Sequence, residues 1–260
     1  MTVEIARTFE RVGNIDFSRQ INATQASDAW QAQRHTRITA SAAAAVFPGV
    51  SSTVTTADLH RKLRGLPAKP FNDYALSAMS AGKQMEPILF SELASVMPRR
   101  VLITCSLFLS EDNLGATPDA IIVDGHVVVE LKWRVGAEAA WNNELGHTVF
   151  CQVQLQMHVT GARSAYVYCG CASGERRLWL VLYSPSFMYV WTVWKNMAVA
   201  LAEEHEARPR ADNGTYDHCS LFIALEMKHH SAEVRLPQVP QILGQECRPV
   251  RSEEHTSELQ

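Results

Sequence analysis

Two acidic residues and a lysine lie close together within one apolar stretch, residues 115–134. Asp119 opens a short apolar run, and Glu130 and Lys132 lie two positions apart on the next run. Side chains two apart on a strand point to the same face of a sheet. Buried charges are costly unless they are paired or bind a metal. A hard cation such as Mg²⁺ takes oxygen ligands, so the pattern favours a metal site beside a lysine that orients water or stabilises negative charge.

Between the two apolar runs, Asp124 and Gly125 are a strong signal for a tight turn. Glycine accepts the positive φ that a two-residue hairpin turn needs, so the stretch predicts a β-hairpin. A bare D…ExK spacing also occurs by chance in many proteins. A surface hairpin with a simple Glu–Lys pair is therefore the alternative for this stretch when it is taken alone.

The composition is that of an ordinary globular protein, with 47% hydrophobic and 20% charged residues among 260. This length suits one large domain, or one domain with appendages. The net charge of −3 argues against a generic basic protein that coats DNA. A role in nucleic-acid binding would therefore need a local basic patch, or metal ions that neutralise phosphates.

The six cysteines form no CxxC pair and lie mostly in apolar runs, which is typical of reduced core residues. The N-terminal residues contain no apolar signal-peptide core, and no apolar run is long enough to span a membrane. We therefore expect an intracellular protein that is not secreted and has no membrane partner. It would be nuclear in a eukaryotic host and cytoplasmic otherwise.

The chain divides into four segments by composition. Residues 1–23 are polar and weakly patterned and suggest an N-terminal arm, and residues 24–206 carry the regular patterning of the main domain. Residues 207–250 form a C-terminal extension of uncertain structure. Residues 251–260 resemble the translation of a common sequencing adapter, so they are excluded from reasoning about the fold.

Helices and strands are mixed along the main domain. Helices are predicted from Ser27 or Asp28, after Thr39 or Ser41, and at 55–63, 72–96, 137–145, 147–161 and 187–206; strands are predicted at 101–109, 120–123, 164–171 and 177–183 and from 127 onward. Gly82 and Pro87 interrupt the long region at 72–96, which favours two helices over one. Glu86 lies at this break, where it faces either inward or the solvent.

Two further polar groups each have a structural and a functional interpretation. Arg34 and Arg37 precede Ser41, which begins an alanine-rich segment. A hydroxyl and free N–H groups at a helix start either bind an anion or cap the helix. Gln152 and Gln156 are one helical turn apart and share a face. They either hold a ligand near a metal site or lie on the surface.

Together these pieces resemble one family, the lambda-exonuclease or YqaJ viral recombinase branch of the PD-(D/E)XK nucleases. The resemblance covers roughly residues 28–205, and several blocks in family order make chance unlikely. The blocks are Arg34…Ile38-Thr-Ala-Ser41, Gly82-Lys-Gln-Met-Glu86, Pro118-Asp119…Glu130-Leu-Lys132 and Gln152-Val-Gln154 followed by Met157, Val159 and Thr160. The fold that the resemblance implies is α/β (α+β), a restriction-endonuclease-like core with a central mixed sheet flanked by helices.

The resemblance also implies roles for the matching residues. Asp119, Glu130 and the carbonyl of Leu131 would hold Mg²⁺, with Mn²⁺ as the alternative. Glu86 would support the metal site, Lys132 would be the catalytic lysine, and Gln152 would lie at the edge of the active site. Arg34 and Ser41 would form a pocket for the DNA 5′-phosphate, and Arg37 is a weaker candidate for the same pocket.

The function that follows from the resemblance is a Mg²⁺-dependent deoxyribonuclease that resects double-stranded DNA ends in the 5′-to-3′ direction. The alternatives are an endonuclease or alkaline-nuclease-like enzyme on the same core, and a DNA-end-binding recombination module without catalysis. The family further suggests a single-strand-annealing recombinase as partner, and a homotrimer.

Overall fold

The computed structural model describes residues 14–21, 23, 27–35, 37–50, 54–135, 145–203 and 213–234. The predicted helix at 137–145 falls almost wholly outside these residues, as do residues 1–13 and the tail at 251–260. Among the described helices, none is both long and apolar enough to cross a membrane. The elements are η1 Phe17–Arg19, α2 Asp28–Arg34, β1 Ile38–Thr39, η2 Ala40–Val46, α3 Thr56–Leu63, α4 Asp73–Val96, β2 Leu102–Ile103, β3 Phe108–Leu109, β4 Leu114–Ala116, β5 Ala120–Ile122, η3 Val123–Gly125, β6 Val127–Arg134, α5 His147–Thr160, β7 Ser164–Cys171, β8 Arg176–Leu182, α6 Pro185–Glu203, α7 Asn213–His230 and β9 Ser231–Val234.

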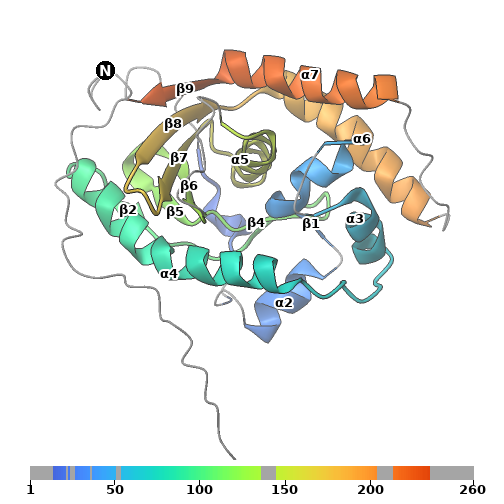
Figure 1. Ribbon diagram of the computed structural model, residues 1–260, viewed down its shortest axis with the longest axis horizontal. Helices are drawn as coiled ribbons and strands as arrows, with labels where there is room; N and C mark the ends of the chain where they lie inside the picture. Colours follow the sequence, from blue (N-terminus) through green and yellow to red (C-terminus); the bar gives the residue numbers. More distant parts are fainter. Residues whose placement is uncertain are drawn as a thin grey trace, which may run out of the picture.

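The fold is built on a mixed sheet with the strand order β2-β5-β6-β7-β8-β9 (Figure 1). Strands β6 and β7 run parallel, and the other neighbouring strands run antiparallel. A smaller sheet has the order β1-β4-β3. Strand β9 belongs to the segment expected as a C-terminal extension, and it pairs with β8, so part of this segment completes the central sheet. The predicted mixed sheet flanked by helices is confirmed.

The two faces of the sheet enter two different hydrophobic cores. On β6, Val127 and Val129 pack in the core beneath α4, whereas Val128 packs in the core that contains α5. This alternation follows from the period of two along a strand. Glu130 and Lys132 are in phase with Val128, so they point toward α5. Helices α4 and α5 therefore cover opposite faces of the sheet (Figure 1).

The predicted hairpin forms, but its turn is of another type. Strands β5 and β6 pair antiparallel, with Ile122 opposite Val127. The connection is the 3₁₀ turn η3, and the residue with positive φ is His126, at 50°, rather than Gly125. The Asp124 carboxylate accepts hydrogen bonds of 3.3 Å from Arg100 and from the Val101 N–H. The contacts with Arg100 and Val101 stabilise this turn, which is longer than the two-residue turn that the sequence predicts.

The helix starts agree with the sequence, and the helix types agree less well. Thr55 and Asp58 form a capping box at the start of α3. After Thr39 the alanine-rich segment is a 3₁₀ helix without a side-chain cap, and its buried alanines show that packing sets its shape. Helix α4 runs unbroken through Gly82 and Pro87, so the expected division into two helices is wrong.

Part of the predicted N-terminal arm is docked on the domain. The Asp16 N–H donates to the Thr160 carbonyl at 2.9 Å, and the Ile21 N–H donates to the Leu107 carbonyl at 2.9 Å. Gly161 ends α5 with a φ of +85°, and a Cβ there would lie 2.6 Å from the Asn14 carbonyl oxygen. A glycine is therefore required where the N-terminal segment crosses the end of α5.

Candidate active site

The hairpin places Asp119 beside the strand that carries Glu130. The Asp119 N–H donates to the Val129 carbonyl at 3.1 Å, and the Leu131 N–H donates to Asp119 Oδ2 at 2.7 Å. The carboxylate of one strand is thus anchored to the backbone of the next. Asp119 and Glu130 are separated in sequence but meet at the same end of the hairpin.

Glu130 is nearly enclosed, at 3% exposure, and both of its carboxylate oxygens are occupied. Its Oε1 lies 2.5 Å from Lys132 Nζ and accepts a hydrogen bond of 2.6 Å from Gln152 Nε2. Its Oε2 accepts a hydrogen bond of 2.6 Å from Gln156 Nε2. Lys132 Nζ also donates to Gln152 Oε1 at 3.1 Å. The structure therefore brings Glu130, Lys132 and Gln152 together, as the sequence predicts.

The charges in this group act strongly on one another. Burial and the charge of Glu130 raise the pKa of the Asp119 carboxyl well above its ordinary value. Burial alone would lower the pKa of Lys132, but the carboxylates of Glu130 and Asp119 outweigh it and raise the pKa. Lys132 is therefore a fixed positive charge, and the acids still repel one another.

Glu86 approaches the same acids from α4, on the other side of the sheet. Burial and the charge of Glu130 raise the pKa of the Glu86 carboxyl, and Lys83 and Lys132 oppose this change. The sequence left open whether Glu86 faces inward or the solvent, and this electrostatic contact favours the inward orientation. Among the described residues, however, no three His, Cys, Asp or Glu side chains form a group ready to hold a metal ion. Glu86 is thus near the acids but is not a formed ligand with them.

The chemistry of the site nonetheless fits a hard divalent cation. Asp119 and Glu130 offer carboxylate oxygens in a place where negative charge is in excess. Gln156 Oε1 and Thr117 Oγ1 are buried, and within the described part of the chain neither has a hydrogen-bond partner. Since Gln156 donates to Glu130, its partnerless oxygen lies near the acids, and such an oxygen is typical of a site that binds water or an ion.

Gln156 is a residue of the site whose role the sequence left open. It is fully buried and donates to Glu130, so the alternative of a surface glutamine is wrong. The spacing of Gln152 and Gln156 was the available signal. Which face of α5 meets the sheet decides between the two interpretations.

Replacing Gln156 with leucine is expected to weaken binding of Mn²⁺ by about 10- to 100-fold, because Glu130 loses the donor that orients Oε2. Calorimetric titration of the metal measures this change. The matched control is Gln154→Leu, since Gln154 is equally buried on the same helix but contacts Leu182 and Ser184 instead. That control should lower thermal stability and leave the affinity unchanged. An affinity within twofold of wild type for Gln156→Leu would refute this role.

The predicted anion-binding residues lie on separate elements. The Arg34 guanidinium stacks 3.9 Å from the Trp30 ring centroid, and burial lowers its pKa to about 10. The exposed Ser41 hydroxyl lies 3.3 Å from that of Thr39. Arg37 Nη1 donates to the Gln33 backbone at 2.6 Å, so this side chain folds back on α2. A shared pocket for Arg34, Arg37 and Ser41 stays a prediction.

Lys62 of α3 is a second cation near Arg34 that the sequence did not single out. Burial and then the positive charge of Arg34 lower the pKa of Lys62 to about 8. Two cations that repel each other while partly buried favour an anion between them. The run of basic residues on α3 is visible in the sequence, but only the tertiary structure places Lys62 beside Arg34.

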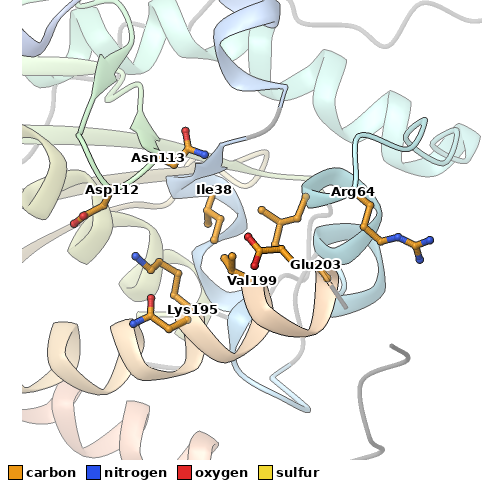
Figure 2. Close-up of a pocket in the computed structure, with 10 residues that line it drawn as sticks. Ile38, Arg64, Asp112, Asn113, Lys195, Val199 and Glu203 are labelled. Atoms are coloured by element: carbon orange, nitrogen blue, oxygen red, sulfur yellow. The ribbon is translucent and has the colours of Figure 1, made fainter. Parts of the chain in front are cut away.

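A cavity of about 390 Å³ lies at the ends of α3 and α6, and Asp119 and Glu130 do not line it (Figure 2). Its lining combines Arg64 and Lys195 with Asp112 and Glu203. The two signs of charge are balanced there, and the lining contains none of the predicted site residues. The chemistry of the hairpin is thus separate from this cavity.

Comparison with known proteins supports the same assignment of the fold. No curated protein sequence matches the chain significantly. The structure of an alkaline exonuclease, LHK-Exo from Laribacter hongkongensis, is 17% identical and covers 76% of this chain and 99% of that one, with a TM-score of 0.55. LHK-Exo in complex with dAMP gives the same identity and coverage, with a TM-score of 0.56. At this identity the likeness shows a shared fold.

The sequence itself matches a family model described as the YqaJ-like viral recombinase domain. The match spans residues 29–163, which contain Glu86, the hairpin acids, Lys132 and the three glutamines of α5. Since these residues make up slightly more than half of the chain, the protein belongs to the family of YqaJ-like viral recombinase domains.

Proposed function

We propose that the protein is a metal-dependent deoxyribonuclease that removes nucleotides from the ends of double-stranded DNA in the 5′-to-3′ direction. The observation that carries the proposal is the arrangement of Asp119, Glu130 and Lys132 at one end of the hairpin. A charged lysine beside two carboxylates suits phosphodiester hydrolysis. The carboxylates can bind the metal cation, and the lysine can stabilise the negative charge that develops on the phosphate. The family and the fold shared with an alkaline exonuclease support the same reaction.

In this proposal, Asp119, Glu130 and the Leu131 carbonyl hold Mg²⁺, or Mn²⁺ in its place. The ion supplies Lewis-acid activation of water and neutralises charge on the phosphate. Lys132 stays protonated and donates hydrogen bonds to the attacking water or to a phosphate oxygen. Gln152 holds the Lys132 ammonium at 3.1 Å and so keeps it beside Glu130.

Digestion of three substrates tests the proposal: linear duplex DNA with a 5′-phosphate, the same DNA with a 5′-hydroxyl, and closed circular DNA. We expect loss of one strand from the linear substrates with Mg²⁺, faster with the 5′-phosphate, and none with EDTA. Equal cleavage of the closed circle would favour the endonuclease. Folded protein that binds DNA ends without cutting them would favour the inactive end-binding module.

The cations of α2 and α3 suggest how a DNA end is selected. We propose that Arg34, Lys62 and the Ser41 hydroxyl hold the terminal 5′-phosphate, which carries nearly two negative charges at neutral pH. Arg34 is fixed against Trp30, and Lys62 lies within electrostatic reach of it. A phosphodiester within the strand carries one charge and would bind there less tightly. An annealing recombinase partner and a trimer stay predictions from the family.

The pKa of Lys62 gives this pocket a pH dependence. Because the pKa of Lys62 is lowered to about 8, its charge is present below this pH and is lost above it. The ratio of cleavage rates for 5′-phosphate and 5′-hydroxyl ends should therefore fall as the pH rises through about 8. Lys62→Gln should show a low ratio at every pH, about tenfold below wild type at pH 7.

The control for this experiment is Arg64→Gln, which removes an exposed cation from the end of the same helix. It should keep the wild-type ratio and its pH dependence. If Lys62→Gln also keeps the ratio of wild type, Lys62 takes no part in end selection.

A further inference from the structure

A buried ion-pair cluster joins α4 to the face of the sheet opposite the active-site acids. Glu92 of α4 accepts two hydrogen bonds from Arg176 of β8, 2.6 Å from Nε and 3.0 Å from Nη2. The Tyr168 hydroxyl of β7 donates to the same carboxylate at 3.1 Å. Both charged side chains are 9% exposed. Two parallel bonds from a planar guanidinium fix direction as well as distance, so the cluster sets where α4 lies on the sheet.

The sheet leaves room for α4 at this point. A Cβ on Gly170 of β7 would lie 2.9 Å from Leu89 Cδ2 and 3.1 Å from both Arg176 Nη1 and Trp133 Cζ3. The Arg176 guanidinium also lies over the Trp133 ring, 5.5 Å from its centroid. Trp133 directly follows the catalytic candidate Lys132 on β6. The cluster therefore contacts the strand that carries the active-site residues, from its other face.

Helix α4 is buried chiefly at its C-terminal end. Its buried residues all lie in the C-terminal third, at Leu89, Glu92, Leu93 and Val96. The residues before Glu86 include the exposed side chains of Tyr74 at 73% and Met79 at 54%. Pro87 lacks an N–H, so one intrahelical hydrogen bond is missing next to Glu86. The position of Glu86 thus depends on how the C-terminal part of the helix is anchored.

We infer that the Glu92–Arg176–Tyr168 cluster is a positioning device that holds Glu86 at the edge of the metal site. This inference rests on the proposed metal-dependent function. Glu92 follows Glu86 by six residues, about 9 Å along the helix axis. A change in how Glu92 meets Arg176 is carried along the helix to the Glu86 carboxylate. Glu92, Arg176 and Tyr168 act through Glu86 and do not touch the reacting atoms.

Metal titration with double variants tests the inference. Glu92→Gln keeps the shape of the side chain but removes the charge that binds Arg176, and we expect about tenfold weaker Mn²⁺ binding by calorimetry. In the background of Glu86→Gln, the same substitution should have no further effect on the affinity. An ion pair with a merely structural role would instead lower the affinity, if at all, by the same factor in both backgrounds.

Two variants complete the design. Tyr168→Phe removes a single hydrogen bond to Glu92 and serves if Glu92→Gln does not fold; it should weaken Mn²⁺ binding two- to threefold, again only when Glu86 is present. Arg177→Gln is the matched control, since Arg177 is the next residue of β8 and pairs with Glu175 and Glu233 instead. It should bind Mn²⁺ as wild type does.

The outcomes separate the inference from the proposed function. A wild-type protein that binds Mn²⁺, with Glu92→Gln and Tyr168→Phe binding equally well, overturns the positioning role alone. Equal losses with and without Glu86 overturn it too. A folded wild-type protein that binds neither Mn²⁺ nor Mg²⁺ overturns the proposed function, and the inference with it.

Discussion

Replacing Lys132 with methionine is expected to slow DNA cleavage by about 10²- to 10⁴-fold. Methionine preserves much of the apolar stem but removes the ammonium group, which lies 2.5 Å from Glu130 Oε1 and 3.1 Å from Gln152 Oε1. The carboxylates raise the pKa of Lys132, so the group lost is a positive charge rather than a base. The variant therefore lacks the donor for the attacking water or the phosphate.

The same variant should bind Mn²⁺ as tightly as wild type, or more tightly. Lys132 shares Glu130 Oε1 with any bound ion, and its removal frees this oxygen and one unit of opposing charge. A large loss of rate without a loss of affinity distinguishes a catalytic group from a metal ligand. Single-turnover digestion of linear DNA and calorimetric titration measure the two quantities separately.

The control for Lys132 is Lys228→Met, which changes an exposed lysine on α7. It should leave both the rate and the affinity unchanged. If Lys132→Met retains cleavage within tenfold of wild type, Lys132 is not the catalytic lysine. If it loses metal affinity as well, its contribution is to shape the site rather than to donate to the reacting atoms.

Local rules were sufficient for the centre of the site. The period of two along a strand places Glu130 and Lys132 on one face, and the structure confirms this. The turn at Asp124 and Gly125 is found in the right place because the flanking apolar runs fix it. The type of the turn could not be predicted from local sequence, because it depends on the contact of Asp124 with Arg100, a residue 24 positions away.

Long-range packing decides the features that the sequence left open. Gln156 is buried because α5 turns that side to the sheet, which no local pattern specifies. Helix α4 continues through Pro87, and its C-terminal part is held against the sheet by the ion pair of Glu92 with Arg176, 84 residues away. Lys62 and Arg34 belong to different helices, so their proximity depends on tertiary structure alone.

Replacing Asp119 with asparagine is expected to abolish cleavage and to stabilise the metal-free protein. Asparagine still accepts the hydrogen bond from the Leu131 N–H, but it offers the ion a neutral oxygen in place of a charged one. Burial and Glu130 raise the pKa of Asp119, which shows that its negative charge is unfavourable in the folded protein without metal. Removing this charge should raise the free energy of unfolding by about 0.5–2 kcal/mol at pH 7.

The dependence on pH gives the sign of this effect. A carboxyl whose pKa is raised in the folded state binds its proton more tightly there than in the unfolded chain. The contribution of Asp119 to the stability of the metal-free wild type is therefore greatest at acid pH, and it is lost as the pH rises from the ordinary value of 3.8 through the raised value. Asp119→Asn does not titrate, so this loss is absent and the difference from wild type grows with pH.

Urea denaturation in EDTA between pH 4 and pH 8 measures the free energy of unfolding of wild type and of Asp119→Asn. With added Mg²⁺ in place of EDTA, we expect the wild type to be the more stable of the two. The ion stabilises the wild type by binding the folded state, whereas the variant binds it weakly and gains little. Asp124→Asn is the control, because this acid belongs to the same hairpin but pairs with Arg100 at its turn. If Asp119→Asn is less stable than wild type in EDTA at pH 8, the Asp119 charge is satisfied within the protein. The argument that these carboxylates are held in place for a cation would then fail.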